Sequence, residues 1–190
     1  MHLVGLSLGG GVGQQIAIRH GHLLASLTLM STSPGGPGGG ADLSPPTPAM
    51  QESLSTQDAP PDWTDPVQVE GYFFAAEQLF SGTIPVDEVR IRAIARSVFD
   101  RSSSLPSADN HWMAGADESA ATREELADIR VPTLVIHGTA DPLFPLDHGE
   151  ALAREIPGAS LVRVEGMGHQ NPPPPTWDQI VAEIVKHTSR

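Results

Sequence analysis

The chain has 190 residues, 39% of them hydrophobic, so it is long and apolar enough for one packed domain with an inserted subdomain. Its formal net charge of −12 excludes a basic nucleic-acid-binding surface, and the absence of cysteine excludes disulfide bonds, thiolate zinc sites and a cysteine nucleophile. Because no apolar run approaches the roughly 20 residues of a membrane span and no signal peptide is recognisable, we expect a cytoplasmic protein without a membrane partner.

The first predicted elements are a strand, a helix and a second strand. Residues 2–6 form a short apolar run, and residues 12–20 carry apolar side chains at helical spacing, with Gly21 as a natural C-cap. Residues 24–32 are rich in apolar and β-branched side chains and predict a buried strand. This order favours a βαβ unit with parallel strands, so we assign residues 1–33 to the core.

Residues 34–128 are predicted to be a linker followed by a helical cap. Gly and Pro dominate residues 33–48, a composition that supports neither a helix nor a sheet. Most of the negative charge follows, since residues 52–128 hold 15 acidic and five basic side chains. A solvated surface is the ordinary explanation of this balance, and the alternative is a lid that repels anionic substrates.

Within the insertion, helices are expected at residues 67–80 and 85–101. The second begins with Pro85 at its first position and has acidic residues in its first turn, where negative charge suits the helix dipole. Thr122-x-x-Glu125 resembles a capping box for one more short helix. Nothing in this part of the sequence predicts a strand.

The alternation of strands and helices resumes over residues 129–190, which we assign to the core. The last helix opens with Thr176-x-x-Gln179, the pattern of a capping box. Strands are expected at residues 133–137 and 160–164, and helices at residues 146–156 and 177–187.

The segment from Gly5 to Gly9 has the pattern G-x-S-x-G and lies between a predicted strand and a predicted helix. A serine at such a turn is held in strained backbone geometry that exposes its hydroxyl, and its neighbours must be small because strand and helix crowd together. Gly9, Gly10 and Gly11 fit this explanation, since three glycines are otherwise costly at a helix start. The helix N-terminus also offers the Leu8 backbone N–H to a developing oxyanion.

The same motif can arise without a catalytic role. G-x-S-x-G occurs by chance in a glycine-rich chain, and a nucleotide-binding loop is conceivable. The nucleotide loop fits poorly, because no lysine follows the glycines, G-x-G-x-x-G is not matched, and no acidic residue lies about 20 residues on.

A serine hydroxyl needs a base to take its proton, and the base needs a carboxylate to hold its tautomer. Asp141 follows the strand at residues 133–137, and His169 follows the last predicted strand. Both fit the chain order serine, acid, histidine, and both lie on loops at the carboxyl ends of strands. Alone, Asp141 is equally explained as a turn residue before proline and His169 as a loop histidine. With Ser7 they form a candidate catalytic triad.

The remaining histidines suggest less. His20-x-His22 resembles a metal-binding pair, but no third ligand is recognisable, so we expect surface residues at a helix end and no metal or cofactor. His137 lies on a predicted strand beside the Asp141 loop, where a structural role is expected.

Residues of the insertion can also reach a substrate. His111 and Trp112 are candidates for lining a substrate pocket in the insertion, although a role outside the pocket is the more ordinary explanation. The phenylalanines of the first cap helix are expected to pack within the lid; they are Phe73, Phe74 and Phe80.

Residues 2–10, 131–142, 156–159 and 164–169 together resemble the matching segments of bacterial α/β-hydrolases, in particular the aclacinomycin methylesterase-like esterases. The resemblance implies a partial α/β-hydrolase fold, in which the C-terminal four strands of the parallel sheet carry an inserted helical cap. It also implies a serine hydrolase that acts on small-molecule carboxylic esters through an acyl-enzyme.

The same triad also serves peptidases, lactonases, perhydrolases and C–C hydrolases, so these chemistries stay open. Members of the family usually have several strands before the serine and a second oxyanion donor in one of the preceding loops. We therefore expect an N-terminally truncated chain, weakly active or inactive alone, that self-associates through its exposed first strand. The rival hypothesis is a non-catalytic descendant that keeps the triad without a competent pocket.

Overall fold

The computed structural model describes residues 1–35, 40–56, 59–110 and 122–189. Its centre is a four-stranded sheet with the order β1-β2-β3-β4, and all three strand pairings are parallel. This confirms the expected α/β class. The strands are β1 (His2–Leu6), β2 (Ser26–Met30), β3 (Thr133–Gly138) and β4 (Ser160–Val164).

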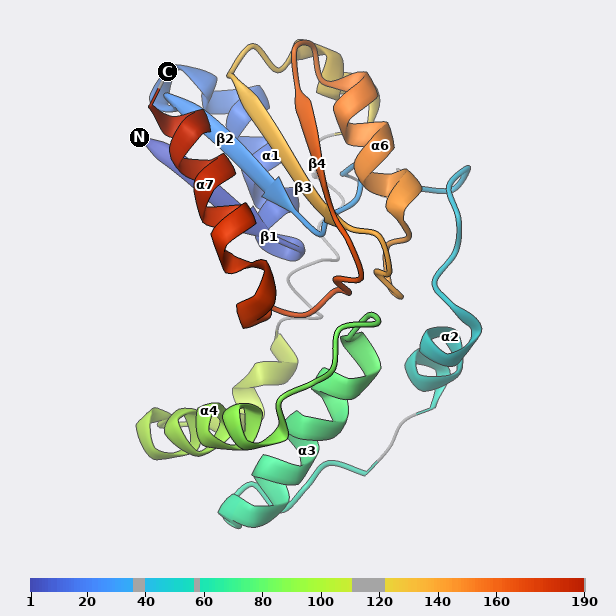
Figure 1. Cartoon of the computed structure of the whole chain (residues 1–190), viewed down its shortest axis with the longest axis vertical. Coiled ribbons are helices and arrows are strands. Elements are labelled where there is room, and N and C mark those ends of the chain that lie inside the picture. The colour runs from blue at the N-terminus through green and yellow to red at the C-terminus, as the bar shows by residue number, and fades with distance from the viewer. Residues whose placement is uncertain (36–39, 57–58, 111–121, 190) are drawn as a thin grey trace.

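Helices cover both faces of this sheet (Figure 1). On one face, α1 (Leu8–His20) and α6 (Leu146–Glu155) enclose a core of buried apolar side chains. On the other, α7 (Trp177–Thr188) packs against a second apolar cluster. Because β2 and β3 lie in the middle and are buried on both faces, every residue in them is buried.

The insertion lies between β2 and β3 and contains α2 (Pro48–Ser55), α3 (Pro66–Phe80) and α4 (Glu88–Arg101). Among its described residues there is no strand, as the sequence predicted. Helices α3 and α4 pack on each other below the end of the sheet (Figure 1). Short 3-10 turns complete the fold: Gly21–Leu23, Leu105–Asp109, Glu124–Asp128 and Pro174–Thr176.

Several helix ends differ from the predictions. Helix α1 begins at Leu8, directly after the serine, and not at residue 12. Helix α4 begins at Glu88 because the Asp87 carboxylate accepts the backbone N–H of Arg90, which leaves Pro85 outside the helix. Gly21 sits at the C-cap of α1 with φ −52°, so it does not adopt the left-handed conformation for which a glycine cap is favoured.

Two predicted capping boxes and one helix also differ from expectation. The Thr176 side chain makes no cap hydrogen bond and binds the Pro173 carbonyl, so that predicted capping box is wrong. At Thr122 only half of the box forms, since its backbone N–H donates to the Glu125 carboxylate at 2.8 Å. Helix α2 was not predicted, although Thr47 caps it and Pro48 opens it.

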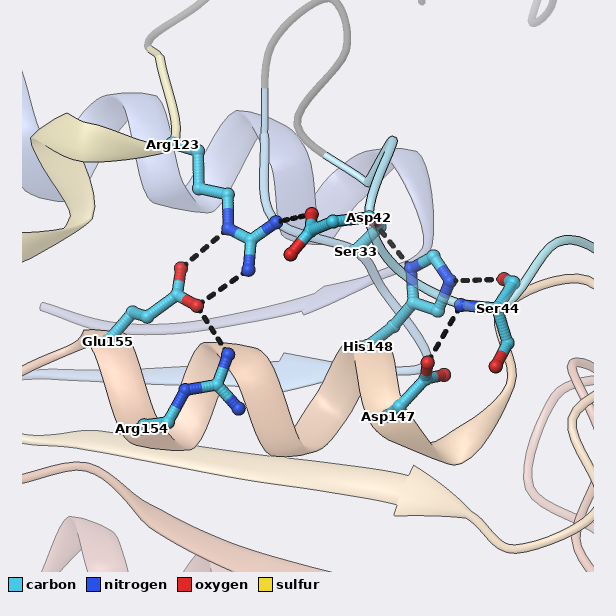
Figure 2. Close-up of polar contacts among 8 residues, drawn as sticks. All are labelled: Ser33, Asp42, Ser44, Arg123, Asp147, His148, Arg154 and Glu155. Carbon is cyan, nitrogen blue, oxygen red and sulfur yellow. Dashed lines mark hydrogen bonds and ion pairs between the residues drawn. The ribbon is translucent and has the colours of Figure 1, made fainter.

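The outgoing end of the insertion is tied to α6 (Figure 2). The buried His148 imidazole lies 2.8 Å from the Ser33 hydroxyl at Nδ1 and 2.9 Å from the Ser44 carbonyl at Nε2. The Ser44 backbone N–H donates to the Asp147 carboxylate at 2.7 Å. Asp147 and His148, at the start of α6, therefore bind the chain that leaves β2 at two points, Ser33 and Ser44.

The returning end of the insertion reaches the same helix (Figure 2). The Arg123 guanidinium donates two hydrogen bonds to the Glu155 carboxylate, each at 2.7 Å, and also pairs with Asp42. Arg154, whose side chain is exposed, contacts the same Glu155 carboxylate. Both ends of the insertion thus form hydrogen bonds with side chains of α6.

Candidate active site

Ser7 lies at the tight turn between β1 and α1. Its backbone has φ 51° and ψ −118°, a conformation that non-glycine residues rarely adopt. The turn is held by neighbouring strand ends: the Ser7 N–H donates to the Met30 carbonyl at 2.9 Å, and the Thr32 hydroxyl donates to the Ser7 carbonyl at 2.8 Å. The Ser7 side chain remains only partly buried.

The close approach of strand and helix explains some of the surrounding glycines and not others. A Cβ at Gly5 would lie 2.3 Å from the Gly9 carbonyl oxygen, and one at Gly10 would lie 2.6 Å from the Thr32 side chain. Gly9 and Gly11 have open space at the same position. The prediction that crowding requires all three of Gly9, Gly10 and Gly11 is therefore wrong for the first and last.

The structure brings Ser7, Asp141 and His169 together in one hydrogen-bonded chain. The Nε2 atom of His169 lies 2.9 Å from Ser7 Oγ, and its Nδ1 atom lies 2.9 Å from Asp141 Oδ2. A carboxylate only accepts hydrogen bonds, so Nδ1 carries the ring proton, and Nε2 is left to accept the Ser7 hydroxyl proton. This is the arrangement that activates a serine hydroxyl.

Asp141 is fixed from both of its oxygens. Its side chain is completely buried, and Oδ1 accepts the backbone N–H groups of Leu143 at 2.9 Å and Phe144 at 2.8 Å. These donors come from the turn that follows β3, so the chain itself orients the carboxylate. The other oxygen then points at the His169 imidazole.

His169 is 8% exposed and has two aromatic neighbours, Phe80 and Phe144. The Phe80 ring, from the end of α3, lies 5.7 Å from the imidazole centre, and the Phe144 ring meets it edge-on at 5.2 Å. The prediction that Phe80 packs within the lid therefore needs correction, because this residue also contacts the core. No periodicity or motif in the sequence separates Phe80 from its neighbours.

A second histidine, His137, lies next to this chain of residues without joining it. Burial lowers the pKa of its imidazole, while the Phe144 carbonyl and the Asp141 carboxylate act in the opposite direction. Among the described residues, Ser7 hydrogen-bonds to His169 and not to His137. The structural role expected for His137 stays a prediction.

The remaining candidates have mixed outcomes. The candidate pocket residues His111 and Trp112 lie outside the described residues. Leu8 occupies the first position of α1, where a backbone N–H has no acceptor within the helix.

The rings of His20 and His22 stand 6.3 Å apart at the end of α1. No group of three or more His, Asp or Glu residues that could hold a metal ion occurs in the described ranges.

Comparison with known proteins places the chain among hydrolases. The model of the alpha/beta hydrolase family matches residues 2–183. The pimeloyl-[acyl-carrier protein] methyl ester esterase of Aromatoleum aromaticum is 31% identical over 169 residues, which cover 87% of this chain and 65% of that protein. The rhodomycin D methylesterase of a Streptomyces species is 28% identical over 202 residues, which cover 98% of this chain and 66% of that protein. The chain thus spans just under two thirds of the length of these relatives.

Solved structures agree on the fold. A meta-cleavage product hydrolase from Pseudomonas fluorescens superposes with a TM-score of 0.66 at 18% identity, over 99% of this chain and 64% of that one. The enol-lactonase from Burkholderia xenovorans gives 0.63 at 24% identity, over 98% and 65%. Where the structure describes the chain, no helix has the length and apolar character needed to cross a membrane.

Proposed function

Because the chain belongs to the alpha/beta hydrolase family, we propose that it hydrolyses carboxylic esters through an acyl-enzyme formed on Ser7. The observation that carries this proposal is the continuous hydrogen-bonded chain from Ser7 Oγ through the His169 imidazole to Asp141. In this proposal Ser7 is the nucleophile, His169 the general base and Asp141 the group that orients the imidazole.

The first half of the reaction forms the acyl-enzyme. Ser7 Oγ attacks the ester carbonyl carbon while its proton passes to His169 Nε2, and the carbonyl oxygen becomes an oxyanion. In this proposal the Leu8 N–H, at the positive end of α1, donates a hydrogen bond to that oxyanion. When the C–O bond of the ester breaks, the proton on Nε2 passes to the departing alcohol.

The second half repeats these steps with water. His169 Nε2 takes a proton from water, whose oxygen attacks the acyl carbon, and the proton returns to Ser7 Oγ as the carboxylic acid leaves. Throughout, Asp141 stabilises the imidazolium without taking its proton. Each proton and bond is accounted for by groups of this chain and water.

We propose methyl carboxylates as the first substrates to test. The relatives in Aromatoleum and Streptomyces that share most of this chain's length are both named for the hydrolysis of methyl esters. Methanol is a small leaving group, and the aromatic rings of Phe80 and Phe144 lie 5.7 and 5.2 Å from the His169 ring.

We further propose that residues 34–128 serve as a linker and cap over this site. Support comes from the contacts of the insertion with the catalytic loops, since the end of α3 reaches His169. His111 and Trp112 remain candidates for lining the substrate pocket.

Ester turnover by the purified chain and its Ser7→Ala variant tests the proposed function. We expect the wild-type chain to release p-nitrophenol slowly from short p-nitrophenyl esters and methanol slowly from methyl esters, and Ser7→Ala to lose up to roughly 10⁴-fold in rate. His169→Ala should lose about as much, and combining the two changes should add little, because the groups act as a unit. Asp141→Asn should fold normally and turn over slowly, since the imidazole is then held in the wrong tautomer. Full turnover by Ser7→Ala would overturn the proposal.

A further inference from the structure

The loop that carries His169 is in backbone contact with the insertion. Residues 80–84, which comprise the last residue of α3 and the first part of its connection to α4, lie against residues 166–169. We name residues 80–84 the cap clasp. The His169 N–H donates to the Phe80 carbonyl at 2.7 Å, and the Thr83 and Ile84 N–H groups both point to the Gly166 carbonyl, at 2.9 and 3.3 Å. Figure 1 shows this connection rising from the cap toward the end of the sheet.

The first of these contacts joins His169 directly to a cap helix. Phe80 is the last residue of α3, and a carbonyl at that position has no partner within the helix. The His169 N–H supplies that partner. The position of the His169 backbone is therefore set partly by where α3 ends.

The packing at this contact is close enough to require glycine on both sides. A Cβ at Gly82 would lie 2.3 Å from the Gly166 carbonyl oxygen and 2.8 Å from the Gly168 nitrogen. A Cβ at Gly168 would lie 2.3 Å from the Gly82 nitrogen and 2.4 Å from the Phe80 carbonyl oxygen. These atoms belong to the backbone and cannot rotate away, so any side chain at either position must move one loop from the other.

On its far side the same loop rests on the segment that leads to Asp141. The Gly166 N–H donates to the Thr139 hydroxyl at 2.9 Å, and the Ala140 N–H donates to the Met167 carbonyl at 3.1 Å. A Cβ at Gly138 would lie 2.1 Å from the same Met167 carbonyl oxygen. Residues 166–169, which carry His169, are thus in contact both with residues 138–140, which lead to Asp141, and with the cap clasp.

We propose that the cap clasp is a positioning element for His169, so that displacement of the cap moves the imidazole out of line between Asp141 and Ser7. This rests on the proposed role of His169 as the base. The imidazole makes one hydrogen bond at each nitrogen, both at 2.9 Å, so a small shift of its backbone lengthens at least one of them. A misplacement of about 1 Å in such a group costs on the order of 10²-fold in rate.

The chain offers a matched pair of glycines to test this. Gly82 is in the clasp, whereas Gly71 lies in α3 with open space where its Cβ would be. We expect Gly82→Ala to slow the labelling of Ser7 by a fluorophosphonate roughly 10- to 100-fold, and Gly71→Ala to label within about twofold of wild type. Urea unfolding of both variants separates a local shift from a loss of fold.

Two further measurements distinguish positioning from general damage. In a His169→Ala background, Gly82→Ala should slow the residual labelling of Ser7 no further, because the clasp acts through the imidazole. Independently of activity, proton NMR of the uninhibited chain reports the deshielded proton between His169 Nδ1 and Asp141, and Gly82→Ala should shift or broaden it while Gly71→Ala leaves it unchanged.

The outcomes separate the two proposals. Wild-type labelling at Ser7 with an unaffected Gly82→Ala variant overturns the positioning role and leaves the proposed function intact. A wild-type chain that does not label at Ser7 contradicts the proposed function, and the NMR comparison then decides the positioning role alone. If the NMR signal of the proton on His169 Nδ1 is unchanged in folded Gly82→Ala, the positioning role is overturned.

Discussion

The Nε2 atom of His137 lies 3.7 Å from Asp141 Oδ2, yet His137 directs its hydrogen bond to the Phe144 carbonyl at 2.8 Å. That bond requires a proton on Nε2, and the buried Nδ1 atom has no partner among the described residues. A second proton at Nδ1 would therefore be buried without an acceptor, which agrees with the lowered pKa of this fully buried imidazole. We therefore expect His137 to be neutral and to stabilise the turn between Asp141 and Phe144 through this hydrogen bond.

We expect this burial to make the fold sensitive to mild acid. Because the pKa of His137 is lower in the folded chain than its ordinary value near 6.5, the unfolded chain binds the proton first as the pH falls. The stability due to neutral His137 is present above that ordinary value and is lost as the pH falls below it toward the folded pKa. His137→Gln should be less stable than wild type by about 1–3 kcal/mol at pH 7.5, and by less at pH 5.5. Urea unfolding at both pH values checks this, and an unchanged difference would contradict it.

The glycines of the serine turn give a second prediction. Gly10→Ala should destabilise the chain by about 1–3 kcal/mol, because its Cβ collides with the Thr32 side chain that binds the Ser7 carbonyl. Gly11→Ala is the control, since its Cβ meets open space within the same helix. Because alanine favours a helix over glycine, this change should raise the free energy of unfolding by about 0.5–1 kcal/mol. Urea unfolding compares the two. Equal effects would mean that the crowding at Gly10 relaxes freely.

These glycines illustrate what the sequence can and cannot predict. The strand–serine–helix order and the loops bearing Asp141 and His169 follow from local pattern and from the chain order of the family, and the structure brings all three residues together. Which glycine is crowded depends on Thr32, a residue 22 positions beyond Gly10 whose approach no local pattern records. The same holds for the contact between Phe80 and His169, which joins residues from opposite halves of the chain.

Arg123 and Arg154 contact the same carboxylate but should differ in their contribution to stability (Figure 2). The Arg123 side chain is 17% exposed and that of Arg154 is 62% exposed, so water screens the second pair far more. Arg123→Gln should cost about 1–3 kcal/mol of the free energy of unfolding, and Arg154→Gln less than about 0.5 kcal/mol.

The pH dependence of this pair has a defined sign. The Arg123 guanidinium, as hydrogen-bond donor, lowers the pKa of Glu155. Its contribution is therefore present above the unfolded pKa of a glutamate and is lost as the pH falls through the lower folded pKa. The difference between wild type and Arg123→Gln should shrink in acid. A difference that is constant down to pH 3 would contradict the assignment.

The edge of the sheet leads to a prediction on association. In the described sheet β1 pairs only with β2, and Val4 in its middle is 50% exposed. We expect the chain to self-associate with rising concentration, and Val4→Lys to reduce this, because a charge on an edge strand opposes pairing. Val89→Lys, an 81% exposed site on α4, is the control and should have no effect. Light scattering over a concentration series that finds monomers throughout would refute the expectation.

Labelling with a fluorophosphonate followed by mass mapping of the modified peptide tests the central claim most directly. The probe reacts with a serine whose hydroxyl is activated by a neighbouring base. The 2.9 Å contact between Ser7 Oγ and His169 Nε2 makes Ser7 the serine that we expect to react. We expect one covalent adduct, carried by Ser7, that disappears in Ser7→Ala and is reduced far more in His169→Ala than in His137→Gln. An adduct that persists in Ser7→Ala, or that maps to another serine, would contradict the account.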